Sequence, residues 1–403
     1  YRDYGFGLPI QFNNKNVFRN AEIFQLTFRP SVEFQGNLFT GVKFSATQLS
    51  LSASILIPHI LLPQLSFLPD PDHNVNLVNT KTTLNTSAIY EYNSDYERKV
   101  ATIGLVYQFN KKLLSWFVSP FEFSLIGTKL NSSILIERAK TDIFLQNLFS
   151  NSVIMDARFG FTYSNKAVAK GKNFIFVKWD ALEWAGNTLT AANMLLNSSK
   201  SPDGHYEAFG VNYYQYVKSD IDYRFNRIID KNNAYVFRCF SGIIVPYGNS
   251  PLYSPFEKRF FVGGANDLRG WNPRGVGPGS YSATNQIDQS GDIKLEANGE
   301  YRFNVYNLWF EGALFADAGN VWALRPDITR PGADFALDRF YKEFAADAGI
   351  GIRLNFSIVL IRFDFAVPIL NPGYSNLSDR LVITNVNNSW MKNTFNFAIG
   401  YPF

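Results

Sequence analysis

Apolar and polar residues alternate with a period of two in many segments of this sequence, each about 10 to 14 residues long. Segment 292–303 is the clearest: one face carries Asp292, Lys294, Glu296, Asn298, Glu300 and Arg302, and the other carries Ile293, Leu295, Ala297, Tyr301 and Phe303. The pattern recurs in 153–163 and 359–367, and in 395–403 it predicts one face shared by Phe395, Phe397, Ile399, Tyr401 and Phe403. Successive side chains of a β-strand point to opposite faces, so the alternation predicts an all-β fold.

Segment length and aromatic content distinguish a soluble β-sandwich from a transmembrane barrel. Strands that cross a bilayer need about 9 to 11 residues, whereas strands of soluble proteins average about 5 or 6. Aromatic residues make up 16% of the chain, and charged residues make up 18%, against about 25% in ordinary globular proteins. Outer-membrane barrels place aromatic girdles at both membrane interfaces. We therefore predict a transmembrane antiparallel β-barrel that forms a single domain over residues 1–403.

The alternating segments define about fifteen strands, with boundaries uncertain by a few residues. They lie at 4–12, 22–34, 43–56, 80–93, 97–109, 116–126, 152–164, 173–184, 208–226, 234–247, 292–303, 308–318, 343–355, 358–367 and 393–403. Bacterial single-chain barrels have even strand numbers, so we expect about 16 strands, the first of them upstream of Tyr1. Long connections such as 184–207, 248–291 and 371–392 and short turns such as 110–115 are expected at opposite ends of the barrel.

Composition and spacing argue against several other classes of protein. The net charge of +4 is too small to indicate nucleic-acid binding. One Cys and three widely separated His residues predict no metal site, no cofactor and no Ser-His-Asp arrangement, so we do not expect an enzyme. No run of about 18 apolar residues indicates a membrane-spanning helix. The first residues also lack the pattern of a signal peptide.

The longest connection contains a glycine-rich motif, FFVGGANDLRGWNPRGVGPGSY, at 260–281. It closely resembles the signature loop of the outer-membrane protein assembly superfamily, which includes BamA, TamA and the two-partner secretion transporters. The family motif Val-Arg-Gly-aromatic is present here as Leu268, Arg269, Gly270 and Trp271. This resemblance implies that the loop folds back into the barrel lumen, where its arginine meets an acidic residue of a following strand.

The segment LFADAGNVW, at 314–322, resembles the family strand that supplies this acidic residue, which implies that Asp317 is the partner of Arg269. Glu300 is in the place of a second acidic residue on the preceding strand. Alternation independently predicts that Glu300 and Asp317 both face the lumen. The alternative interpretation is that Arg269 is an ordinary loop cation and Asp317 a turn residue at the end of a strand.

The resemblance extends over nearly the whole chain and is strongest to the TamL type of barrel found in Bacteroidota. It implies periplasmic POTRA domains upstream of Tyr1, outside this chain. The last strand also fits the spacing of the sorting signal that barrel proteins present to the assembly machine, through Asn396, Ala398, Tyr401 and Phe403. The alternative is that these positions are simply lipid-facing residues of a final strand, and the two interpretations are compatible.

The function that the resemblance implies is that of an assembly or translocation factor in the outer membrane of a Gram-negative bacterium. It would insert or export client proteins through a lateral gate between its first and last strands. Expected partners are outer-membrane lipid and lipopolysaccharide, unfolded outer-membrane clients, and a TamB-like periplasmic protein or assembly-machine lipoproteins. The alternatives are a two-partner secretion transporter and a passive porin-like channel, although a plain porin needs no long luminal loop with an arginine motif and an acidic partner.

Overall fold

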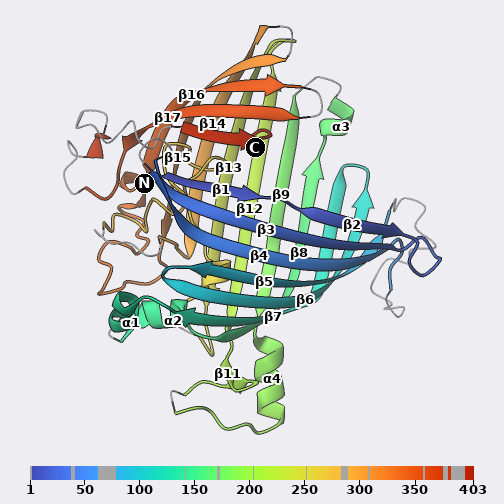
Figure 1. Ribbon diagram of the computed structural model, residues 1–403, viewed down its shortest axis with the longest axis vertical. Helices are drawn as coiled ribbons and strands as arrows, with labels where there is room; N and C mark the ends of the chain where they lie inside the picture. Colours follow the sequence, from blue (N-terminus) through green and yellow to red (C-terminus); the bar gives the residue numbers. More distant parts are fainter. Residues whose placement is uncertain are drawn as a thin grey trace.

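The computed structural model describes residues 2–37, 41–61, 79–140, 142–169, 173–202, 204–250, 252–282, 289–306, 309–356, 359–374, 380–382 and 395–403. One large antiparallel sheet dominates the fold and curves strongly, so that β1–β7 run across the view in Figure 1 while β8, β9, β12 and β13 run close to its vertical axis. No helix in the described residues is long and apolar enough to cross a membrane.

The strands of the large sheet are β1 (Arg2–Gly7), β2 (Ile10–Lys15), β3 (Ile23–Asn37), β4 (Gly41–Ile57), β5 (Lys81–Asn93), β6 (Tyr96–Lys111), β7 (Leu114–Leu130), β8 (Ser152–Ser164), β9 (Phe174–Ala185), β12 (Tyr216–Ile228), β13 (Asn233–Pro246), β14 (Ile293–Tyr306), β15 (Phe310–Trp322), β16 (Ala345–Asn355), β17 (Leu360–Leu370) and β18 (Phe395–Ile399). A separate hairpin is formed by β10 (Glu207–Ala208) and β11 (Val211–Asn212). The helices are α1 (Ser133–Ala139), α2 (Ile143–Leu148), α3 (Lys166–Ala169), α4 (Asn187–Leu195), η1 (Phe256–Lys258) and η2 (Phe340–Lys342).

The sheet confirms the predicted all-β class and antiparallel order, and every ladder joins strands that are neighbours along the sheet path. Both β1 and β2 pair with β3, through Ser31–Gly36 and Ile23–Phe28 respectively, so together they occupy one strand position. The strand predicted at 208–226 is wrong at its beginning. The chain turns back at Phe209 and Gly210, which both have positive φ, and the long strand starts only at Tyr216.

The two faces of the sheet have opposite chemistry. Large apolar side chains such as Leu51, Phe237 and Ile350 are about half exposed on the outer face. Charged side chains such as Arg353 and Arg362 are fully buried on the inner face. A soluble sheet would place its charges in water and its apolar residues in the core. The observed arrangement is that of a barrel with an outer face in lipid and a polar interior.

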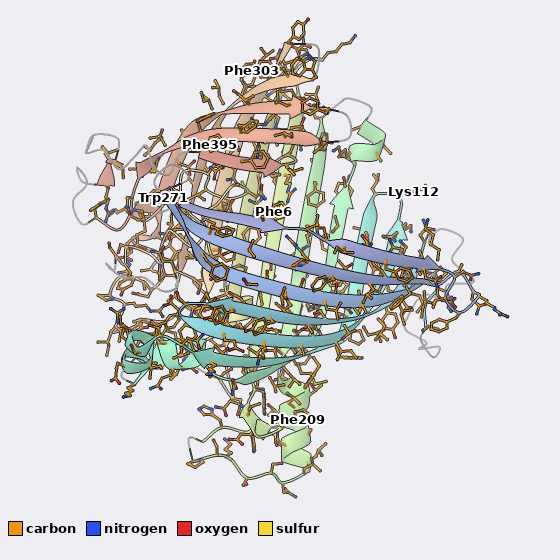
Figure 2. All side chains as sticks on the ribbon, viewed as in Figure 1. Phe6, Lys112, Phe209, Trp271, Phe303 and Phe395 are labelled. Atoms are coloured by element: carbon orange, nitrogen blue, oxygen red, sulfur yellow. The ribbon has the colours of Figure 1, made fainter. Side chains whose placement is uncertain are left out.

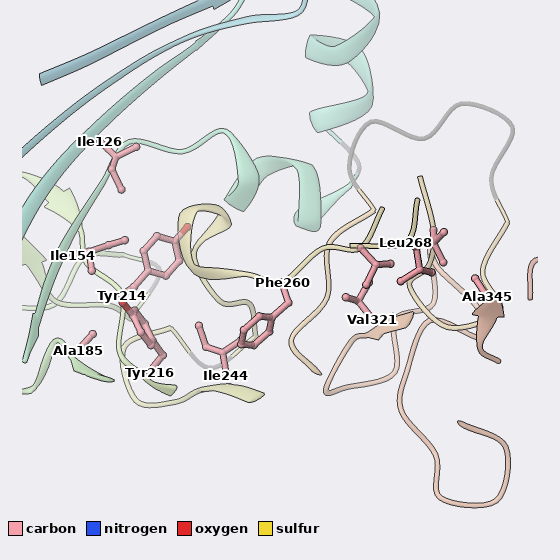
Figure 3. Packing of buried hydrophobic residues seen from close by; sticks show 12 residues of the cluster. Ile126, Ile154, Ala185, Tyr214, Tyr216, Ile244, Phe260, Leu268, Val321 and Ala345 are labelled. Carbon is pink, nitrogen blue, oxygen red and sulfur yellow. The ribbon is translucent and has the colours of Figure 1, made fainter. Parts of the chain in front are cut away.

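The two ends of the sheet also differ. Short turns such as 112–113 and 229–232 connect strands at one end, which also carries α3. The other end carries α1, α2, α4 and the long connection 247–292 between β13 and β14 (Figure 1). Longer loops are extracellular in outer-membrane barrels, so we assign the long-loop end to the outside. An apolar cluster lies in the interior and links the sheet to this connection, through residues that include Tyr216, Ile244, Phe260, Leu268 and Val321 (Figure 3).

The edges of the sheet are β1 with β2 on one side and β18 on the other. In the described residues, β18 forms a ladder only with β17, and that ladder is limited to Phe395–Ile399. Gly400 then adopts φ 88° and turns the chain out of the strand. The prediction that Tyr401 and Phe403 continue the face of Phe395 is therefore wrong, because the alternation of faces ends with the ladder. The sixteenth strand expected upstream of Tyr1 stays a prediction.

We expect the amides of β18 to exchange with solvent at least about tenfold faster than those of β14, because in the described residues the ladder of β18 covers only Phe395–Ile399, against β17. Strand β14 is paired with both β13 and β15, so it serves as the internal reference. Hydrogen exchange followed by mass spectrometry on the protein in detergent micelles measures both in one sample. Equal protection of the two strands would contradict the assignment of β18 as a weakly held edge.

Candidate functional site

The connection 247–292 folds back on itself inside the sheet at the glycine-rich motif. Gly263 and Gly264 have φ of 104° and 105°, a region that glycine enters without steric cost. The amide of Gly264 donates to the carbonyl of Trp271 at 2.8 Å, which closes the turn. A Cβ on Gly263 would lie only 2.0 Å from the carbonyl oxygen of Asn272. The two glycines therefore allow the backbone to approach closely enough to present the motif to the strands.

Arg269 lies between two strand carboxylates. Its Nε and Nη2 donate to the two oxygens of Asp317 on β15 at 2.8 and 2.9 Å, and its Nη1 donates to Glu300 on β14 at 2.7 Å. The side chains of all three residues have no exposed surface. A planar guanidinium matches a carboxylate with two parallel hydrogen bonds, so this contact fixes orientation as well as distance. The structure thus brings together the three residues that the sequence suggested as loop motif and acidic partners.

Burial and charge act on Arg269 in opposite directions. Desolvation alone would lower its pKa, but the hydrogen bonds and charge of Asp317, together with the charge of Glu300, outweigh burial and raise the pKa. The guanidinium also lies 3.5 Å from the ring centroid of Phe315, a stacking contact. Phe315 has room because Gly349 faces it: a Cβ there would be 2.5 Å from the ring. Arg269 is therefore held by ion pairs at its edge and by an aromatic ring on one face.

The other residues of the motif are fixed by packing. Leu268 is fully buried in the apolar cluster of Figure 3, and a Cβ on Gly319 would come within 3.0 Å of its side chain. Gly270 approaches β16 so closely that a Cβ would lie 2.5 Å from the Cβ of Asp347. Trp271 is half-buried against the same apolar cluster. Each motif position thus requires its residue type: apolar, cationic, without side chain, and aromatic.

The network extends from Arg269 toward the edge of the sheet. The second oxygen of Glu300 accepts hydrogen bonds from Arg302, at 2.7 Å, and pairs with Arg353 of β16 at 2.9 Å. Arg362 of β17 donates to the carbonyl of Ala265 and to the side chain of Asn266, each at 2.8 Å. Strands β14 to β17 therefore all contact the loop or its arginine. Alternation in 359–367 indicates that Arg362 lies on the polar face of its strand. Its partners in the loop could not be predicted in this way, because the loop has no alternating pattern.

Lys258 of η1 is a second anchor of the loop, which the sequence analysis missed. Its ammonium lies 2.6 Å from Glu183 on β9, 2.9 Å from Asp156 on β8 and 3.8 Å from Glu122 on β7. Burial would lower the pKa of Lys258, but Glu183 and Asp156 outweigh it and raise the pKa. The hydroxyl of Tyr216 also donates to Glu183 at 2.6 Å. One lysine therefore ties the loop to three consecutive strands on the side opposite Arg269.

The end of the chain also contacts this interior. The side-chain amide of Asn396 on β18 donates to the carbonyl of Arg269 at 2.7 Å, and Ala398 faces inward opposite Arg362. Beyond Gly400, the hydroxyl of Tyr401 donates to Glu311 at 2.9 Å. Two further contacts come from Arg302, whose guanidinium lies 4.3 Å from the ring of Tyr401 and donates to the carbonyl of Phe403 at 3.4 Å.

These contacts place Tyr401 and Phe403 at the mouth of the interior, where a cavity of about 1020 Å³ opens at the short-turn end. Asn396 and Ala398 lie on the inner face of β18, while Phe395 and Phe397 are exposed on its outer face. The four residues that the sequence assigned to a sorting signal are thus turned toward the lumen in the folded chain. In the part of the chain that the structure describes, no group of three or more His, Cys, Asp or Glu side chains is placed to hold a metal ion.

We expect Arg269→Ala to destabilise the barrel by about 3 to 5 kcal/mol, because it leaves Asp317 buried without its cation. Arg269→Lys should recover only part of this loss, since an ammonium cannot make the bidentate contact. Asp317→Asn should approach the effect of Arg269→Ala, and the double variant should cost much less than the sum. Denaturant unfolding of the four proteins in micelles gives the cycle. Strictly additive, small effects would contradict a coupled buried pair.

Lys258→Met keeps the length of the side chain but removes its charge, so Asp156 and Glu183 lose their shared cation. We expect a loss of about 3 kcal/mol in unfolding free energy and faster proteolysis of the connection 247–292. The matched control is Lys231→Met, in the exposed turn 229–232, which should change neither quantity. Equal behaviour of the two variants would show that Lys258 does not anchor the loop.

Known proteins share this sequence pattern and this fold. The sequence matches the Omp85 superfamily domain over residues 201–403, which is half of the chain. The structure is similar to BamA from Haemophilus ducreyi lacking POTRA domains 1–3, with a TM-score of 0.54 and 14% sequence identity over 98% of this chain and 70% of that chain. It is also similar to CdiB from Acinetobacter baumannii, with a TM-score of 0.51 and 11% identity over 98% of this chain and 56% of that chain. At these identities the two likenesses concern the fold, and the fold agrees with the sequence match. The chain therefore belongs to the Omp85 superfamily, and its sheet is that of an outer-membrane β-barrel protein.

Proposed function

We propose that this barrel inserts or exports client proteins at the outer membrane, through a lateral gate between β18 and the first strand of the complete barrel. The observation that carries the proposal is the weak edge at β18. In the part of the chain that the structure describes, its ladder with β17 covers Phe395–Ile399, and the chain leaves the sheet directly afterwards at Gly400. An edge strand of this kind offers unpaired backbone groups to another strand.

The physical basis of the gate is the cost of exposing backbone to lipid. An unfolded strand that enters the bilayer must satisfy its N–H and C=O groups, each of which costs several kcal/mol if it is left unpaired in hydrocarbon. Pairing with the edge of β18 by β-augmentation would satisfy half of them before the client reaches lipid. The outer face of β18 is already adapted to this environment, because Phe397 and Ile399 are exposed there. The folding of the client itself would supply the free energy.

The luminal loop is held more strongly by β14 and β15 than by β18. The side chain of Arg269 forms ion pairs with β14 and β15. Its contact with β18 is a hydrogen bond from the side-chain amide of Asn396 to the backbone carbonyl of Arg269. A single neutral hydrogen bond contributes about 1 kcal/mol, far less than a buried ion-pair network loses when it is broken. The contacts to β18 would therefore yield before those that hold the loop.

Several finer assignments belong to this proposal. We infer a TamL-type role, POTRA domains and a first strand upstream of Tyr1, and partners that include unfolded outer-membrane clients, lipopolysaccharide and a TamB-like protein or assembly lipoproteins. We also infer that Asn396, Ala398, Tyr401 and Phe403 direct the assembly of this barrel while the chain is still unfolded. In the folded chain Tyr401 is engaged by Glu311, so such a signal would act before folding.

A two-partner secretion transporter is the second candidate, supported by the similarity to CdiB. A passive porin is less well supported, because the loop with Lys258 and Arg269 fills interior space between opposite sides of the sheet. Conductance separates these classes: a porin gives a large and steady ion current, whereas a plugged barrel does not. Secretion through the lumen would require displacement of the loop, so it would be abolished by tethering the loop to the wall.

We expect a disulfide between position 397 of β18 and a facing cysteine in the first strand of the complete protein to abolish client insertion in reconstituted membranes. Cys239, which is exposed on the outer face, is first replaced by Ser. The matched control joins cysteines at positions 363 and 397, which face each other on β17 and β18, and should leave insertion intact because that ladder need not open. Full activity of the oxidised gate variant would contradict the lateral gate.

A further inference from the structure

A groove of about 800 Å³ lies on the outer face of β4 to β7, toward the long-loop end. Its floor includes three small residues: Ala88 faces Ala101 across the β5–β6 ladder, and Gly127 lies on β7 opposite Lys99. Leu49 on β4 and Leu125 on β7 stand beside this floor, and both are exposed. Three small residues among large apolar neighbours leave a channel in a face that otherwise carries aromatic and branched side chains.

Phe209 forms one wall of this groove from outside the sheet. It occupies the tip of the β10–β11 hairpin, next to Gly210, and both residues have positive φ, 56° and 74°. A two-residue hairpin turn with positive φ at both positions favours Asn or Asp followed by Gly, and a bulky aromatic residue there is strained. The ring is 81% exposed and contacts Phe123 of β7 edge-on, with centroids 5.9 Å apart (Figure 2). Strain in a residue that buries little of its own surface points to a binding role for that residue.

Cations lie at the rim of the groove on the side nearer the loops. Lys99, also part of the lining, lies two residues closer to the start of β6 than Ala101, and its side chain is 69% exposed. Its ammonium pairs with Glu97 at 3.1 Å, and the side chain of Glu97 is partly buried. Lys129 is exposed on β7 directly opposite Glu97. Tyr96, the first residue of β6, and Ala101 are five residues apart, which is about 16 Å along the strand. The floor of the groove therefore lies within one leaflet of a hydrocarbon core about 30 Å thick.

We propose that this groove binds one acyl chain of an outer-leaflet lipid of the lipopolysaccharide class, with the phosphate of the lipid held by Lys99 and Lys129. The order of groups matches that of the lipid: cations lie at the rim, and beside them an apolar channel runs across β4 to β7. The groove faces the bilayer, because it lies on the apolar outer face of an outer-membrane barrel. Phe209 closes the channel from the side of the β10–β11 hairpin. This site is independent of the gate, which lies at β18.

The test uses the full chain in nanodiscs of phosphatidylcholine, with purified diphosphoryl lipid A as the probe and native mass spectrometry as the measure of lipid bound. Ala101→Trp fills the floor and should weaken binding about tenfold. The matched control is Ile103→Trp, the next outward position of β6, which is exposed but does not line the groove, and it should bind lipid A as the unchanged protein does. Heat-modifiable migration confirms that both variants are folded.

Two further measurements test the wall and the charge. Phe209→Gly removes one wall without altering any barrel strand and should also weaken binding several-fold, which keeps the test valid if Ala101→Trp fails to insert. Lys99→Gln combined with Lys129→Gln should reduce the affinity for diphosphoryl lipid A to that for its dephosphorylated form. The proposal is overturned if Phe209→Gly and Ala101→Trp bind normally, if Ile103→Trp loses as much lipid as Ala101→Trp, or if removal of the phosphates changes nothing.

Discussion

A guanidinium without exposed surface must find all its hydrogen-bond partners inside the protein, and Arg269 finds them on two different strands. Asp317 on β15 takes two of its N–H groups, Glu300 on β14 takes a third, and the ring of Phe315 covers one face. Removal of Arg269 leaves Asp317 buried without its cation, which costs several kcal/mol. The path of the loop is therefore dictated by this arginine, and the glycines around it are needed so that the backbone can follow.

The inverted chemistry of the sheet buries carboxylates in the interior, and such a loop can bring cations to them. An outer face in lipid must be apolar, so the polar half of every strand points inward, where Asp156, Glu183 and Glu300 are all buried. Buried carboxylates require cations or donors, and at the β7–β9 side the strands contribute Arg158, which pairs with Glu122 and Asp156. Lys258 supplies one there, just as Arg269 does at β14 and β15. The loop thus contributes charge to the interior as well as filling it.

The sequence was sufficient for what depends on the period of two. Strand positions, the inward orientation of Glu300 and Asp317, and the apolar outer face all follow from alternation along a continuous ladder. Alternation fails where the ladder ends: Gly400 turns the chain inward, so Tyr401 meets Glu311 instead of lipid. Glycine at 400 and proline at 402 were the available signals for that break.

Contacts between the loop and the strands were harder to predict for a different reason. The pairing of Arg269 with Asp317 came from a family resemblance, whereas Lys258 belongs to no motif and lies far along the chain from its partners Glu122, Asp156 and Glu183. From the sequence alone, Lys258 cannot be distinguished from the many lysines that lie on a protein surface. Only the three-dimensional course of the loop places it against three strands at once. The same holds for Phe209, whose position on the outer face follows from a hairpin that the strand pattern did not reveal.

The proposed gate requires that β18 can leave the sheet without loss of the contacts that hold the loop. Departure of β18 from the sheet would break a short ladder, the hydrogen bond from Asn396 to Arg269 and the contacts of the tail with Arg302. It would leave the pairs of Arg269 with Asp317 and Glu300 intact, since both carboxylates belong to strands that are paired on each side. The strongest interior contacts thus lie next to the edge but do not depend on it. In the proposed gate, the last strand would therefore leave while the loop and the neighbouring strands keep their positions.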